Sequence, residues 1–187
     1  MKIAEQGILN PGERGTRRAL ATVSSVTALP DGTLMASYRV GTTKDCDDET
    51  VEFRRSTDGG RTWGDPVAPF STVLGPSTPP SAPLRTGGRR GSLRVAYVTP
   101  LGGDRLIAVA LWIDRQAHPG KPLFDPETEG CLPMALVVAD SGDMGRAWSP
   151  WRVVPVPDDV GPPSLTNPVL RFPGGRLTIS IETNKTY

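Results

Sequence analysis

Short runs of alternating apolar and polar residues, separated by Gly, Pro and Asp, fill most of the 187-residue chain. Pro30-Asp31-Gly32-Thr33 lies between two such runs and predicts a hairpin turn. We expect one four-stranded unit over about residues 19–72. Its predicted strands are Leu20–Leu29, Leu34–Val40, Thr50–Arg55 and Pro66–Ser71.

The same pattern predicts a second unit over about residues 81–156 and the start of a third over about residues 163–187. Periodicity leaves a short helix open as an alternative at Arg105–Asp114, and a long polar insertion follows from His118 to Pro133. Turns are expected at Thr86–Gly91 and Pro173–Arg176. The predicted strands are Ala82–Arg85, Leu93–Thr99, Arg105–Asp114, Leu136–Ala139, Trp151–Val156, Pro163–Leu170 and Leu177–Glu182.

Two stretches share the spacing Ser-x-Asp-x-Gly-x-x-Trp, and each follows a predicted strand. In such a turn the Ser and Asp side chains can accept backbone N–H bonds, Gly can take a positive φ and Trp can pack beside the turn. We therefore predict that a strand, a pinned turn and a second strand occur twice. The motif residues are Ser56, Asp58, Gly60 and Trp63, and Ser141, Asp143, Gly145 and Trp148.

This repeated motif resembles the Asp-box, or bacterial neuraminidase (BNR) repeat, which marks the sialidase (neuraminidase) superfamily and related β-propellers. The resemblance implies an all-β fold and a six-bladed propeller, of which this chain holds about two and a half blades. It therefore implies the N-terminal part of a longer protein. It also implies a structural role for both copies, at the outer rim and away from the active site.

Composition and charge narrow the partners that we expect. A net charge of +1 gives no reason to expect nucleic acid or an anionic membrane. The N-terminal residues lack the apolar core of a secretory signal, so the sequence predicts a cytoplasmic protein. Cys46 and Cys131 are predicted to be free thiols, and no spacing suggests a metal site or a cofactor. The oligomeric state stays open.

The resemblance implies a sialidase-like exo-glycoside hydrolase that acts on terminal sugars, acidic ones included. Sialidases use three arginines to hold a carboxylate, a Tyr–Glu pair as nucleophile and its base, and an Asp as acid/base. That Asp falls here on Asp45, with Asp47 as its rival. Asp45 could protonate a leaving group if burial raised its pKa. Arg39, at the end of the second strand, could bind a substrate carboxylate.

Three points leave other interpretations open. Ala21 stands where the family has its first arginine, so Arg18 is a displaced candidate for substrate binding, together with Glu182. The nucleophile is expected beyond Tyr187. The alternative interpretation of the acidic loop around Asp45 is a solvated connection between two strands. The alternative function is a non-catalytic Asp-box propeller that serves as a carbohydrate- or protein-binding module, and the fold does not decide between the two.

Overall fold

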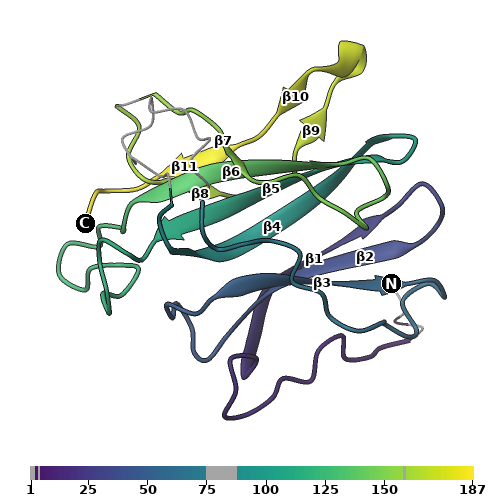
Figure 1. Cartoon of the computed structure of the whole chain (residues 1–187), viewed down its shortest axis with the longest axis horizontal. Helices are drawn as coiled ribbons and strands as arrows, with labels where there is room; N and C mark the ends of the chain where they lie inside the picture. The colour runs from purple at the N-terminus through teal and green to yellow at the C-terminus, as the bar shows by residue number, and fades with distance from the viewer. Residues whose placement is uncertain (1–2, 4, 75–87, 158) are drawn as a thin grey trace.

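Figure 1 shows the computed structural model, in which antiparallel sheets follow one another along the chain. The structure describes residues 3, 5–74, 88–157 and 159–187. These ranges contain no α-helix, which confirms the predicted all-β class. The first sheet has the order β1 (Leu20–Ala28), β2 (Leu34–Gly41) and β3 (Thr50–Ser56), and the second has the order β4 (Gly91–Gly102), β5 (Arg105–Asp114), β6 (Met134–Ser141) and β7 (Arg152–Val153).

The last part of the chain forms two short pairs of strands around a 3₁₀ turn at Pro173–Gly175. Because these pairs are separate, the two long strands predicted there are each interrupted. Between the pairs, the N–H of Ser180 donates to Asn167 Oδ1, and Thr166 Oγ1 donates to the carbonyl of Ser180. The pairs are β8 (Pro163–Leu165) with β11 (Ile181–Thr183), and β9 (Leu170–Arg171) with β10 (Leu177–Thr178).

The structure corrects one more expected strand and does not test another. The segment predicted as the fourth strand makes a single bridge, between Phe53 and Val67, because Pro66 and Pro69 have no N–H to donate to a ladder. The strand predicted at Ala82–Arg85 lies outside the described residues, as does the start of the turn predicted at Thr86–Gly91. The hairpin of the second sheet instead turns after Gly102, between β4 and β5.

Strand β5 is the most deeply buried strand of the fold, since every residue from Leu106 to Asp114 is buried. Its continuous apolar sequence suits a strand that is covered on both faces. One face contributes Leu106, Ala108, Ala110 and Trp112 to a core shared with the first sheet. The other contributes Ile107, Val109, Leu111 and Ile113 to a core shared with β8 and the 115–133 insertion.

Polar contacts fix the first sheet against β4 within the shared core. Ser37 Oγ donates a 2.6 Å hydrogen bond to the carbonyl of Ala96. Thr27 Oγ1 donates a 2.9 Å bond to the carbonyl of Val98. Because a buried hydroxyl needs a hydrogen-bond partner, these bonds fix the position of the first sheet relative to β4. Figure 1 shows the resulting arrangement, with the first sheet beneath β4.

The two Ser-x-Asp-x-Gly-x-x-Trp loops have the predicted pinned geometry. Ser56 Oγ accepts the N–H of Gly60 at 2.8 Å, and Ser141 Oγ accepts that of Gly145 at 2.7 Å. Both glycines have positive φ, 91° and 78°. The Asp58 carboxylate accepts hydrogen bonds from Thr62 and from the hydroxyl of Ser56. These bonds, those from Thr62 most of all, hold the pKa of Asp58 far below its usual range.

The two loops differ in what they pack against. The Trp148 ring lies edge-on to two rings of the first-sheet unit, with centroids 5.9 Å from Phe53 and 5.4 Å from Phe70. Arg55, on β3, donates a hydrogen bond to the carbonyl of Met144 in the same loop. The second loop therefore holds the second sheet onto the first. Trp63 packs on its own turn, beside Gly60.

Replacing Trp148 with Ala should destabilise the chain more than replacing Trp63 with Ala. The Trp148→Ala change removes a partly buried ring from the core between the sheets, which should lower the free energy of unfolding by about 2–3 kcal/mol. Urea titration of both variants measures the difference. Equal losses for the two variants would show that the Trp148 ring does not stabilise the contact between the sheets.

Candidate functional site

Three arginines and three carboxylates meet where β2 ends, β3 begins, β4 begins and β5 ends. We call this set the arginine cluster; it comprises Arg39, Arg94, Arg115, Asp45, Asp47 and Glu49. The arginines come from both sheets, whereas the carboxylates all lie in the loop between β2 and β3. The cluster is therefore assembled across the interface between the sheets.

Glu49 lies at the centre of the arginine cluster. Its carboxylate is 3.0 Å from Arg39, 3.9 Å from Arg94 and 4.0 Å from Arg115. Its side chain is only 1% exposed, and within the described part of the chain neither of its oxygens has a hydrogen-bond partner. Burial raises the pKa of Glu49, and the three positive charges only partly oppose that rise.

Asp45 lies nearer the surface, with its side chain 21% exposed. Arg94 forms an ion pair with it, and Arg39 lies 3.5 Å away. Burial works to raise the pKa of Asp45, but the hydrogen bond and charge of Arg94, together with the charge of Arg39, outweigh it and lower the pKa. An acid catalyst would need a raised pKa, whereas the pKa of Asp45 is lowered by its arginine neighbours.

Two of the arginines are fixed by further hydrogen bonds. Arg39 donates from Nε and Nη2 to the hydroxyl of Thr22, at 3.0 and 2.7 Å. Arg115 donates to the hydroxyl of Ser92 at 3.0 Å and to the carbonyls of Asp45 and Cys46. The loop between β2 and β3 is therefore held in place by a residue of the second sheet. Arg94, 20% exposed, is the arginine of the cluster most open to solvent.

The remaining predicted residues lie at or beyond the edge of the cluster. Asp47 contacts Arg115 at 3.4 Å and accepts the N–H of Gly120. Arg18 pairs with Glu52 at 3.1 Å. In the strand register Glu52 is opposite Tyr38, so these two side chains are on the same face of the first sheet. Arg39 follows Tyr38 on β2 and is therefore on the other face. Arg18, which pairs with Glu52, thus lies on the opposite face from Arg39.

Glu182 is exposed on β11, opposite Ser164. Within the described ranges, no ion pair or side-chain hydrogen bond links it to the arginine cluster. The described residues also hold no group of three or more His, Cys, Asp or Glu side chains suited to a metal ion. In the same part of the chain, no helix is long and apolar enough to cross a membrane.

Sequence reasoning missed Glu49, Arg94 and Arg115 as members of the site. Arg94 does carry a local signal, because it interrupts the apolar run of β4 at a register shift between Leu93 and Val95. Arg115 directly follows the buried strand β5. The convergence of both residues on Glu49 depends on how the two sheets pack, which the sequence does not show.

No protein-family model matches the sequence, and the comparison with curated proteins finds no match. Solved structures do match. The intramolecular trans-sialidase from Ruminococcus gnavus has a TM-score of 0.58 and 13% identity, over 91% of this chain and 57% of its own. An ulvan lyase has 0.53 and 15%, over 89% and 38%. The endo-arabinase from Bacteroides thetaiotaomicron has 0.50 and 17%, over 88% and 54%.

The chain thus covers between 38% and 57% of the length of these three structures. Together with the successive antiparallel sheets, the likeness shows that the chain forms part of a β-propeller. A propeller is also the fold that the repeated Ser-x-Asp-x-Gly-x-x-Trp motif led us to expect. At these identities the likeness concerns the fold alone.

The pKa of Glu49 gives a pH-dependent prediction. A carboxyl whose folded-state pKa is raised above its ordinary value of 4.5 contributes most to stability below that pH, and the contribution is lost as the pH rises through the folded-state pKa. The free energy of unfolding of the wild type minus that of Glu49→Gln should therefore fall as the pH rises above about 4.5. Urea titrations at several pH values measure it.

Glu182→Gln, which removes an exposed carboxylate outside the cluster, is the control for this series. Its difference from the wild type should change less across the same pH range. A wild-type advantage over Glu49→Gln that instead grows with pH would mean that the three arginines outweigh burial.

Proposed function

We propose that the chain is part of a sialidase-like exo-glycoside hydrolase that acts on terminal acidic sugars. The observation that carries this proposal is the convergence of Arg39, Arg94 and Arg115 beside Asp45, at one end of both sheets. Guanidinium groups bind carboxylates through paired hydrogen bonds, so a cluster of this kind suits a carboxylate-bearing sugar. The two Ser-x-Asp-x-Gly-x-x-Trp loops would then be Asp-boxes with a structural role.

The ion pairs give Asp45 a route to the acid role. A substrate carboxylate that binds Arg94 and Arg39 competes with Asp45 for the same guanidinium groups. Asp45 then loses part of its neutralising charge and gains a negative neighbour, and both changes raise its pKa. The protonated side chain can donate to the leaving-group oxygen. We assign the nucleophile to no residue of this chain.

A second candidate is a non-catalytic propeller that binds carbohydrate. It is favoured by the charge balance of the cluster, in which three arginines face three carboxylates, and by the lowered pKa of Asp45. A site whose arginines are already paired with carboxylates, and in which the pKa of Asp45 is lowered, can bind polar sugars without performing chemistry on them. The two candidates differ in whether Asp45 transfers a proton.

Replacing Arg94 with Gln should weaken the binding of N-acetylneuraminate. The change removes the most exposed positive charge of the cluster, and loss of one charge-assisted contact should raise the Kd by about tenfold. Isothermal titration calorimetry gives the two constants. Arg152→Gln, which removes an exposed arginine paired with Asp140, is the control and should leave the Kd unchanged. Equal affinities for wild type and Arg94→Gln would remove Arg94 from the sugar site.

Replacing Asp45 with Ala should lower the rate at which a fluorogenic sialoside is hydrolysed by the complete protein. Loss of a general acid typically costs about 10²–10⁴ in rate. Asp140→Ala, an exposed carboxylate in the second sheet, is the matched control. An unchanged rate in Asp45→Ala would remove Asp45 from the mechanism. Binding of the sugar without hydrolysis by the wild type would favour the binding module.

A further inference from the structure

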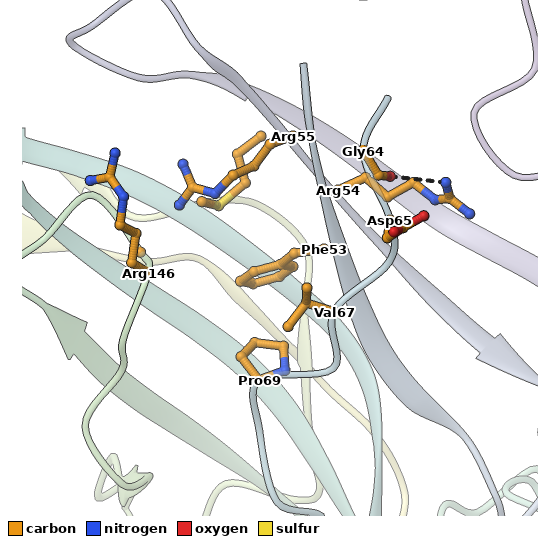
Figure 2. A pocket seen from close by; sticks show the side chains of 10 residues that line it. Phe53, Arg54, Arg55, Gly64, Asp65, Val67, Pro69 and Arg146 are labelled. Atoms are coloured by element: carbon orange, nitrogen blue, oxygen red, sulfur yellow. Dashed lines mark hydrogen bonds between the residues drawn. The ribbon is translucent and has the colours of Figure 1, made fainter. Parts of the chain in front are cut away.

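A recess with a volume of about 400 Å³ lies at the opposite end of the first sheet from the arginine cluster. We call it the loop cavity, because its walls are β3, the segment after the first Ser-x-Asp-x-Gly-x-x-Trp loop and the tip of the second such loop. Figure 2 shows the side chains that line it, among them Arg55, Arg146, Phe53, Val67 and Pro69. Its volume is within the range of pockets that bind small molecules.

The loop cavity is separate from the proposed sugar site. In the register of β2 and β3, Arg39 is opposite Val51 and Met35 is opposite Arg55. The two positions are therefore four residue steps apart on β3, which corresponds to about 13 Å along the strand. A ligand of the loop cavity would thus bind independently of a sugar at the cluster.

Three arginines line the loop cavity, and two of them, Arg55 and Arg146, lie on the side away from Asp65 in Figure 2. Within the described residues, no carboxylate oxygen lies within 4.0 Å of the guanidinium of Arg55 or Arg146. Each donates to a backbone carbonyl instead, Arg55 to Met144 and Arg146 to Asp143. Burial, followed by the charge of Arg146, lowers the pKa of Arg55, and the charges of Asp31 and Asp143 oppose this only in part.

The floor of the loop cavity is apolar. Phe53, Val67 and Pro69 lie side by side beneath the Arg55 side chain in Figure 2. Val67 is 58% exposed, a large apolar surface for a residue that lines a recess. The acidic side chain of the lining, Asp65, lies beside Arg54, on the far side of Phe53 from Arg146. The positive and the apolar parts of the recess are therefore adjacent, and its acidic group lies apart from both.

The backbone of the second loop approaches this recess closely. A Cβ on Gly145 would lie 2.8 Å from the methyl carbon of Met35 and 3.2 Å from Arg55 Nη2. A Cβ there would displace the flexible ends of these two side chains, and the φ of Gly145, 78°, is one that glycine adopts readily. Arg146 follows directly, and its exposed side chain donates a 3.2 Å hydrogen bond to the carbonyl of Asp143.

We propose that the loop cavity binds a small organic carboxylate that carries an apolar ring. The carboxylate lies between Arg55 and Arg146 and provides the ion-pair partner that neither guanidinium has among the described residues. The ring lies on Phe53, Val67 and Pro69. A bidentate guanidinium contact gives the affinity for the anion, and the floor removes apolar surface from water.

The test is a titration of the full chain with benzoate, followed by ¹H–¹⁵N NMR. The amides of Gly64, Gly145 and Arg146 should shift and saturate together, because all three line the recess. Benzamide, which has the same ring without the charge, should not produce saturable shifts at the same concentrations. Inorganic sulfate, an anion without a ring, should bind at least about tenfold more weakly than benzoate if the floor contributes.

Arg146→Gln should raise the Kd for benzoate by about tenfold through the loss of one charge-assisted contact. Arg61→Gln is the matched control, since Arg61 holds the same position in the first loop and donates to Asp58 over the same 3.2 Å that separates Arg146 from Asp143. It does not line the recess and should leave the Kd unchanged. Saturation by benzamide, equal losses in the two variants, or no saturable shift with benzoate would each overturn the proposal.

Discussion

The structure depends on the burial of β5 on both faces. Its side chains alternate between two cores, so an apolar layer must cover each face. The first sheet supplies one layer, and β8 with the insertion after β5 supplies the other. Trp112, fully buried in the first of these cores, also donates its indole N–H to Thr72 at 2.9 Å. A large apolar side chain contributes about 1.5–3 kcal/mol when buried, so the strand favours stacking of successive sheets.

The arginine cluster follows from that stacking. Arg115 comes directly after β5, and Arg94 lies near the start of β4, so both occur where the interface between the sheets ends. The loop between β2 and β3 brings the carboxylates to the same place. Burial of these charges is costly, and their mutual attraction offsets part of the cost. Such a buried network constrains the geometry of a site more than it adds to stability, which suits a role in recognition.

The two Ser-x-Asp-x-Gly-x-x-Trp loops show how one local motif takes different tertiary roles. In each turn the Ser hydroxyl donates to the Asp carboxylate and accepts the N–H of the Gly. Trp148 adds a contact with Phe53 and Phe70, and its neighbour Gly145 forms one wall of the loop cavity. The turn is fixed by residues close in sequence, whereas the contact depends on which sheet lies opposite.

The sequence by itself determined the all-β class, the hairpin at Pro30–Thr33 and the pinned turns, because alternation and turn chemistry act over a few residues. It also placed Asp45 near Arg39, because the loop that contains Asp45 directly follows the strand that ends just after Arg39. Only the tertiary structure brought Arg94 to Asp45, a partner 49 positions away, and buried Glu49 among three arginines. It also set the pKa of Asp45 low and that of Glu49 high, because desolvation and charge depend on neighbours that sequence spacing does not reveal.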